Sequence, residues 1–289
     1  MKVNNRLISF FIVFFAYVCA SVVGICVFIH LDLNLWLKVL ISDVLATVVI
    51  YIFSLVFKNA SVYDPYWSVQ PMVILTAFAI FEKLNLMKVL LLVVVFLWGI
   101  RLTANWAYTF KGLTHQDWRY TMLGEKTGRF FPIVNLLGIH MFPTLVVYLC
   151  VMPAVFLLTS DARSNILSYF GIAISFFAVV LQTISDCQMH KFRKYKTTEN
   201  FIRIGLWKHS RHPNYLAEVL MWWGVGICCI FAINANWWMI IGAFVNNLMF
   251  LFVSVPLADG RQSKKEGFAD YKSKTNGLIP IKLKRTKKV

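Results

Sequence analysis

Long apolar stretches recur along this chain of 289 residues. A helix needs about 20 mainly apolar residues to cross the hydrocarbon layer of a membrane. Only 15% of the residues are charged, against about 25% in ordinary soluble domains, so a soluble globular fold is excluded. The eight expected spans are Leu7–Ile29, Leu35–Phe57, Trp67–Phe81, Leu86–Tyr108, Ile133–Leu158, Ile166–Cys187, Tyr215–Ile233 and Trp237–Pro256.

The sequence therefore predicts an all-α, polytopic transmembrane helical bundle with about eight spans. Seven are possible, because the third expected span, Trp67–Phe81, is short. The first span, Leu7–Ile29, is too long for the apolar region of a signal peptide, and no convincing cleavage site follows it. We expect an integral, multi-pass protein of the endoplasmic reticulum in a eukaryote, or of the inner membrane in a bacterium, with the lipid bilayer as its partner.

The basic residues fall almost entirely on one side of the expected spans. Lys and Arg number 29 against 13 Asp and Glu, which gives a net charge of +16. With eight spans, 24 of the 29 basic residues flank one membrane face and three flank the other. Because cytoplasmic loops carry an excess of Lys and Arg, both termini are predicted to be cytoplasmic. The positive charge then reflects topology, and we expect no nucleic-acid partner; the oligomeric state is left open.

The six cysteines lie within the expected spans or at their ends, and no Cys-x-x-Cys pair is present. This pattern predicts neither a metal site nor a disulfide framework. The cysteines are interpreted as packing residues.

Polar side chains stand in line at the end of the sixth expected span. Gln182, Asp186, His190 and Arg193 follow at offsets of four, four and three residues, so they share one helical face. Such a stripe can hold the ribose and phosphate oxygens of a nucleotide, because Arg suits bidentate phosphate contacts and Asp suits ribose hydroxyls. The structural alternative is a self-paired helix end whose side chains reach toward the membrane surface.

A second polar run, 210–218, introduces the seventh expected span. Pro213 suits the first turn of a helix. Asn214 and Glu218 are four residues apart and face the same way, and Glu218 lies just inside the membrane, where a carboxylate needs a partner. Helix capping by Ser210 or His212 is the structural alternative, but it leaves Glu218 unexplained.

Residues 62–68 precede the third expected span. Asp64, with the phenols Tyr63 and Tyr66 at a pocket mouth, can polarise a substrate carbonyl. The alternative is a turn at Asp64 followed by an aromatic belt at the membrane interface.

Two further sets of ionisable residues have open roles. Asp43 lies inside the second expected span, so it is either functional or hydrogen-bonded to a neighbouring helix. Arg101 and Arg119 can contact a phosphate, or they can pair with Asp117 and Glu125.

Four short motifs carry a family resemblance: Asp-Pro-Tyr-Trp-Ser at 64–68, Asp-Trp-Arg-Tyr at 117–120, Arg-His-Pro-Asn-Tyr at 211–215, and Tyr271 followed by Ile-Pro at 279–280. With these motifs the chain resembles the steroid 5-alpha-reductase-like integral-membrane family, and most closely a poorly characterised branch of it. The resemblance covers about residues 60–280. It implies a catalytic domain over 59–289 that ends in a basic cytoplasmic tail, after an N-terminal transmembrane helix pair over 1–58.

The resemblance implies an NADPH-dependent reductase of a carbon–carbon double bond conjugated to a carbonyl in a steroid, isoprenoid or other lipid. Gln182 stands where the family has Asn, and Tyr63-Asp64 stands where it has the Gln-Glu pair that polarises the carbonyl. The expected catalytic residues are Asp64, Tyr63, Tyr66 and Glu218, and the expected cofactor-binding residues are Gln182, Asp186, Arg193, Arg211, His212, Asn214, Tyr215 and Tyr271.

Two other function classes stay open. The run Arg-His-Pro-x-Tyr is also similar to isoprenylcysteine and phospholipid methyltransferases, which implies S-adenosylmethionine as the cofactor. Asp259-Gly260 stands where those enzymes usually carry a Glu-Glu pair. A non-enzymatic lipid-binding protein is the third class, but the polar groups gather at one end and no internal repeat typical of transporters is found.

Overall fold

Helices make up nearly all of the computed structural model, which describes residues 5–161, 163–195 and 201–281. No strand occurs in these ranges. Seven of the described helical segments are long and apolar enough to cross a membrane, so the predicted all-α, multi-pass membrane protein is confirmed. The cytoplasmic placement of both termini stays a prediction, and Lys282–Lys288 of the basic tail lie outside the described residues.

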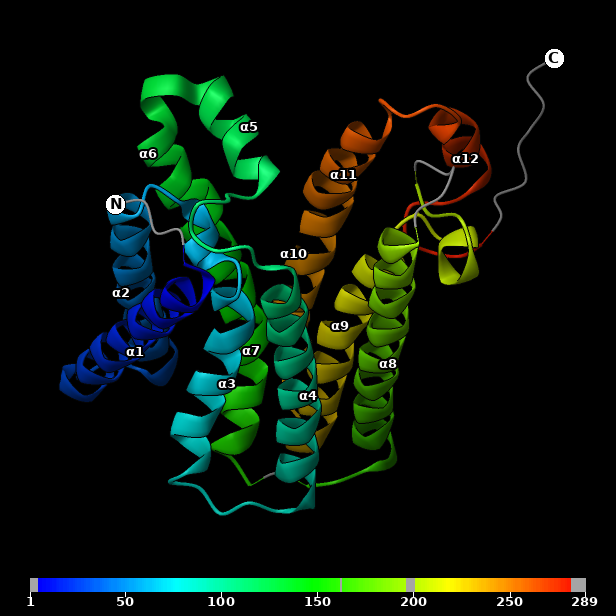
Figure 1. The fold of residues 1–289 in the computed structure, drawn as a ribbon. Helices are drawn as coiled ribbons and strands as arrows, with labels where there is room; N and C mark the ends of the chain where they lie inside the picture. The colour runs from blue at the N-terminus through cyan, green and yellow to red at the C-terminus, as the bar shows by residue number, and fades with distance from the viewer. Residues whose placement is uncertain (1–4, 162, 196–200, 282–289) are drawn as a thin grey trace. The chain divides into compact units, whose positions relative to one another are not determined.

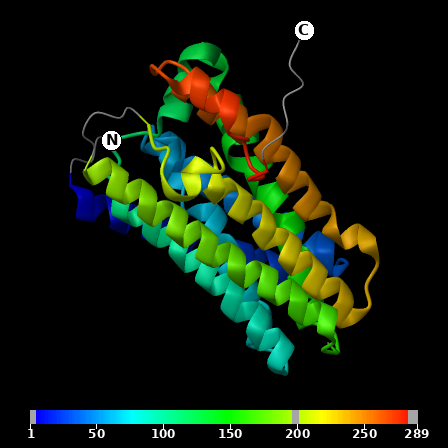
Figure 2. The ribbon, with the colours of Figure 1, turned by 90° about the vertical axis from the view of Figure 1, so that its right-hand side faces the viewer.

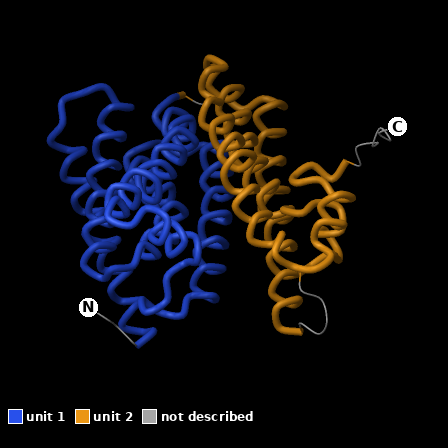
Figure 3. Tube along the Cα trace, turned by 90° about the horizontal axis from the view of Figure 1, so that it is seen from above, with its two compact units in different colours: residues 1–160 blue, residues 161–289 orange. Residues whose placement is uncertain are grey.

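The chain divides into two compact units, residues 1–160 and residues 161–289 (Figure 3). Each unit is described by itself below. The division expected from the family resemblance, between residues 58 and 59, is a different one and stays a prediction.

Unit 1 begins with the long helices α1 and α2, which pack against each other, and continues with α3, α4 and α7 lying side by side (Figure 1). Short helical segments join these elements. In order, the elements are α1 (Arg6–His30), α2 (Leu35–Val56), η1 (Ala60–Tyr63), α3 (Tyr66–Ala79), α4 (Leu86–Thr109), α5 (Trp118–Thr127), η2 (Gly128–Phe130), α6 (Phe131–Val134), η3 (Asn135–Met141) and α7 (Phe142–Leu158).

The third expected span, Trp67–Phe81, folds as α3, which has only 14 residues. At 1.5 Å per residue this helix is about 21 Å long, shorter than the hydrocarbon layer of about 30 Å. It is therefore the expected span that is missing from the seven membrane-length segments. The helix still packs closely on α4, because Gly99 faces the backbone of Ser68: a Cβ at Gly99 would lie 2.9 Å from the Ser68 carbonyl oxygen.

The fifth expected span is part of a longer helical run, Trp118–Leu158. Its middle section η3 is a π-helix, a widened turn that is frequent at functional sites. Here the Nδ1–H of the buried His140 donates a 2.9 Å hydrogen bond to the backbone oxygen of Asn135. The widened turn therefore holds an imidazole inside unit 1.

Unit 2 is built on α8 and α9, which run side by side in Figure 1 and in the turned view of Figure 2. The last membrane-length segment, Trp237–Gln262, is a continuous run of short helical pieces. The elements are α8 (Ile166–Lys194), η4 (Gly205–Lys208), α9 (Pro213–Ile233), η5 (Trp237–Ile240), α10 (Ile241–Met249), η6 (Phe250–Ser254), α11 (Val255–Gln262) and α12 (Phe268–Lys274).

Small residues bring the α8 and α9 backbones into direct contact. A Cβ at Gly171 would lie 2.7 Å from the Gly224 carbonyl oxygen, and a Cβ at Gly224 would lie 2.6 Å from that of Gly171. The Ser175 hydroxyl donates a 3.0 Å hydrogen bond to the Met221 carbonyl oxygen. This close approach is typical of membrane helix pairs with small residues at the interface, and it fixes the register of the polar residues farther along α8 and α9.

Candidate functional site

In unit 1 the carboxyl of Asp64 lies directly before α3 and accepts a 2.7 Å hydrogen bond from the Tyr120 hydroxyl of α5. Burial raises the pKa of Asp64 to about 6, although the Arg119 charge and the Tyr120 hydrogen bond both oppose the rise. Arg119 itself pairs with Asp117, with 2.8 Å between Nε and Oδ1. Of its two expected roles, pairing is the one that the structure shows. Asp64 can therefore carry a proton close to neutral pH.

The two phenols next to Asp64 in the sequence have other partners. The buried Tyr63 hydroxyl lies 2.9 Å from the Thr144 hydroxyl of α7. Tyr66 is within hydrogen-bonding reach of Asp43 on α2. The structure thus brings Tyr63 and Tyr66 together, with ring centroids 5.5 Å apart, while the phenol that supports Asp64 is Tyr120.

In unit 2 the carboxylate of Glu218 is fully buried and has two donors. The Gln182 side chain of α8 donates a 2.8 Å hydrogen bond to Oε2, and the Trp222 indole donates one of 3.0 Å to Oε1. A carboxylate in a membrane helix requires such donors. Gln182 and Glu218, two expected site residues from different helices, are therefore in direct contact.

The same region presents two buried amide oxygens that lack a donor among the described residues: Gln182 Oε1 and Asn214 Oδ1. Farther along α8, Asp186 is partly buried and Arg193 is exposed in the last turn. This arrangement offers hydrogen-bond acceptors at depth and positive charge at the surface, which suits a ligand with donor groups at one end and anionic groups at the other.

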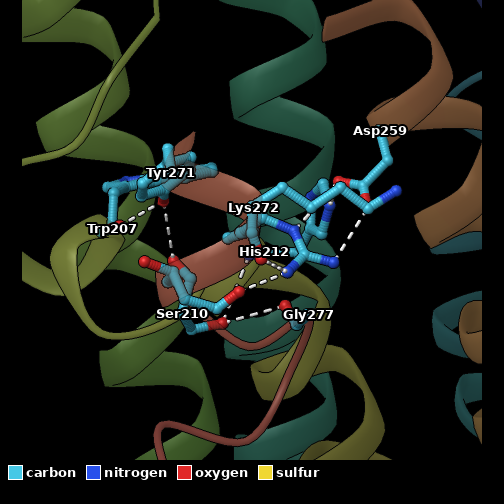
Figure 4. Close-up of polar contacts among 9 residues, drawn as sticks. Trp207, Ser210, His212, Asp259, Tyr271, Lys272 and Gly277 are labelled. Atoms are coloured by element: carbon cyan, nitrogen blue, oxygen red, sulfur yellow. Dashed lines mark hydrogen bonds and ion pairs between the residues drawn. The ribbon is translucent and has the colours of Figure 1, made fainter. Parts of the chain in front are cut away.

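A cluster around Asp259 joins the start of α9 to α11 and α12 (Figure 4). The Asp259 carboxylate accepts a 2.8 Å hydrogen bond at Oδ2 from Arg211 Nη2, and its Oδ1 lies 3.0 Å from His212 Nε2. The Lys272 ammonium lies 3.4 Å from Oδ2. Arg211 also donates to the backbone oxygen of Thr275. We call these residues the Asp259 clamp.

Backbone contacts extend the Asp259 clamp. The amides of Arg211 and His212 donate to the carbonyl oxygens of Asn276 and Gly277 over 2.9 and 3.0 Å. The Tyr271 hydroxyl donates to the backbone oxygen of Trp207 (Figure 4), and burial raises the pKa of Tyr271 to about 12. These contacts give three expected cofactor-binding residues a structural task, while their contact with a cofactor stays a prediction.

Tyr215, the last member of the Arg-His-Pro-Asn-Tyr run, stacks on His212 with ring centroids 5.0 Å apart and planes 11° apart. The Tyr215 ring also contacts Phe250, with ring centroids 5.0 Å apart and planes 50° apart. The run therefore packs as one block at the start of α9. In the part of the chain that the structure describes, no group of three His, Cys, Asp or Glu residues is arranged to hold a metal ion.

Four partners were not expected from the sequence: Tyr120, Trp222, Asp259, and Gln70, whose side-chain amide donates to Asp43. A sequence signal existed for two of them. Asp259 is a lone carboxylate at the end of an apolar stretch, where it needs cations, and Trp222 lies four residues after Glu218 on the same helical face. Tyr120 and Gln70 lie in regions that the sequence alone does not pair.

Comparison with protein-family models gives a match to "Protein of unknown function (DUF1295)" over residues 50–275. The chain belongs to this family. DUF1295 proteins are related to steroid 5-alpha-reductase-like proteins. An uncharacterised protein of Schizosaccharomyces pombe (strain 972 / ATCC 24843), C594.04c, is 27% identical over 197 residues, which are 57% of this chain and 56% of that protein. The match thus spans little more than half of that relative's length, and no solved structure matches.

Proposed function

We propose that this DUF1295 protein is a membrane-embedded reductase that uses NADPH to reduce a carbon–carbon double bond conjugated to a carbonyl group in an apolar lipid. The observation that carries the proposal is the pair of buried amide oxygens, Gln182 Oε1 and Asn214 Oδ1, which lack donors among the described residues. Buried acceptors of this kind are costly unless a partner satisfies them.

The residues of unit 2 fit NADPH. Its carboxamide and ribose groups carry the N–H and O–H donors that Gln182 and Asn214 lack, and its phosphates suit the guanidinium of Arg193. Glu218 fixes the Gln182 side chain through their 2.8 Å hydrogen bond, so the acceptor oxygen of Gln182 is held in one direction. Asp186, on the same face of α8, can accept from a ribose hydroxyl.

The residues of unit 1 fit the substrate carbonyl. When bound, NADPH would supply a hydride to the β-carbon of the enone, and the negative charge that develops on the substrate carbonyl oxygen would be stabilised by a hydrogen-bond donor. Asp64 can be that donor, because its pKa is raised to about 6 and part of its population is protonated near neutral pH. The Tyr120 hydroxyl donates a hydrogen bond to Asp64 Oδ1 and so orients the carboxyl group.

Cofactor preference tests the proposal directly. The thermal stability of the purified full chain is measured with NADPH, NADP⁺ and S-adenosylmethionine. We expect stabilisation by the nicotinamide nucleotides, and a weaker response in Asn214→Ala. Asn236→Ala, the same change beyond the opposite end of α9, is the matched control and should respond like the wild type.

The second test concerns Asp64. If it polarises the carbonyl, Asp64→Asn lowers turnover of an enone lipid by about 10²-fold or more and leaves the NADPH response unchanged. Full turnover in this variant would contradict the role of Asp64. A response to S-adenosylmethionine alone would replace the reductase with a lipid or isoprenylcysteine methyltransferase, and a response to none of the three would favour a non-enzymatic lipid-binding protein.

A further inference from the structure

Unit 1 encloses a cavity of about 430 Å³ between α1, α2 and α3. This volume is within the range of about 300–1,000 Å³ that is usual for small-molecule sites. Most of the lining is apolar, and the half near the ends of α1 and α3 is formed by hydrocarbon side chains, including Phe28, Ile29, Val73 and Phe81. Ile29 and Phe81 are themselves largely exposed, so this half opens to the surroundings of unit 1.

The other half of the cavity carries a small polar group. Asp43 of α2 accepts a hydrogen bond from the side-chain amide of Gln70 on α3, and both residues line the cavity together with Ser42. All three are more than nine-tenths buried, with exposures of 5% for Asp43, 4% for Gln70 and 7% for Ser42. Asp43 is thus hydrogen-bonded to a neighbouring helix, one of the two roles expected from the sequence.

This polar group is incomplete. Gln70 Oε1 and Ser42 Oγ are buried, and neither has a hydrogen-bond partner among the described residues. Gln70 donates its amide nitrogen to Asp43, so its oxygen is left as an acceptor in need of a donor. A serine hydroxyl can both donate and accept. An apolar cavity alone gains nothing from unpartnered polar atoms at one end, because they weaken the fold unless something satisfies them.

We propose that unit 1 holds a binding site for a lipid alcohol, a long-chain or polycyclic apolar molecule with one hydroxyl group. The hydroxyl donates to Gln70 Oε1 and accepts from Ser42, and the hydrocarbon body fills the apolar half of the cavity. A ketone or aldehyde fits less well, because it has no proton to donate to Gln70. The inference rests on unit 1 alone and is independent of the proposed reductase activity.

Photolabelling tests this site. The purified full chain in detergent is labelled with a diazirine-bearing hexadecanol and, separately, with the same probe capped as its methyl ether, and labelled peptides are mapped by mass spectrometry. We expect labels on α1, α2 and α3, with the alcohol binding about fivefold more tightly than the ether, the effect of roughly one neutral hydrogen bond. Ser42→Ala should weaken labelling by both probes, because an ether oxygen can also accept from the Ser42 hydroxyl, and should leave the preference for the alcohol, which depends on donation to Gln70 Oε1. This variant removes no internal hydrogen bond of the described chain.

A blocking variant gives an independent test. Ala77→Phe places a ring in the cavity, since Ala77 lines it, and should abolish labelling. Thr76→Phe is the matched control, because Thr76 is the adjacent residue and is exposed; it should label like the wild type. Equal labelling by alcohol and ether would overturn the hydroxyl site in favour of a cavity for bilayer acyl chains. Labelling that survives Ala77→Phe would overturn the site altogether.

Discussion

Gln182 donates a 2.8 Å hydrogen bond to the carboxylate of Glu218, which lies 36 residues later in the chain and on a different helix. The contact joins α8 and α9, the same two helices that approach closely at Gly171 and Gly224. It connects two residues that belong to separate sequence motifs, and it leaves Gln182 Oε1 buried without a donor among the described residues.

Loss of the Gln182 donor should therefore destabilise unit 2. Gln182→Leu removes the side-chain amide donor of the buried Glu218 and keeps the Trp222 indole donor, and we expect a loss of about 1–3 kcal/mol in the free energy of unfolding. The double variant Gln182→Leu/Glu218→Leu should recover much of this loss, because no carboxylate then stays buried without its donor. Chemical denaturation in detergent measures both. Additive losses in the double variant would contradict the coupling.

Asp259 should be the most sensitive residue of the Asp259 clamp. Asp259→Asn removes the charge that Arg211, His212 and Lys272 share, and removal of one partner from a buried ion pair costs about 3–5 kcal/mol. We expect a lower melting temperature and faster hydrogen exchange at residues 271–277.

Asp270→Asn is the matched control for that variant. Asp270 pairs with Lys274 on the surface of α12, and the two side chains are 64% and 70% exposed. An exposed pair of this kind contributes at most about 0.5 kcal/mol. A similar loss of stability in Asp259→Asn and Asp270→Asn would contradict the larger contribution expected from the buried Asp259.

The raised pKa of Asp64 predicts a pH dependence of stability. Its ordinary value of 3.8 rises to about 6 in the folded chain, so the folded state binds the proton more tightly than the unfolded state. Stability from this group is then lost as the pH rises from about 4 to 6 and is constant above that range. The difference in melting temperature between wild type and Asp64→Asn should follow this course. If the melting temperature of Asp64→Asn changed with pH in the same way as that of the wild type, the assignment to Asp64 would be contradicted.

Close packing of α8 on α9 predicts that a single methyl group is harmful there. Gly171→Ala places a Cβ 2.7 Å from the Gly224 carbonyl oxygen, so the helices must move apart, at a cost of about 1–3 kcal/mol. Gly260→Ala is the control, because a Cβ there meets no described atom within 4 Å. A melting temperature unchanged by Gly171→Ala would show that the contact is loose.

Much of the fold was predictable because membrane spans are a local property of the sequence. Seven of the eight expected spans have membrane length in the structure, and the exception, α3, was already the shortest stretch. The site was predictable only in part. Offsets of four residues placed Asn214 and Glu218 on one face, but no local rule pairs Asp64 with Tyr120, which lies 56 residues away.

The sequence by itself determined that this chain is an all-α membrane protein and which polar residues enter its spans, because hydrophobicity and helical periodicity act over one or two turns. Only the tertiary structure decided the partners: Gln70 for Asp43, Tyr120 for Asp64, and Asp259 for Arg211 and His212. The physical reason is that a buried polar group takes whichever donor or acceptor helix packing brings within about 3 Å, and that packing depends on contacts such as Gly171 with Gly224, far from the groups themselves.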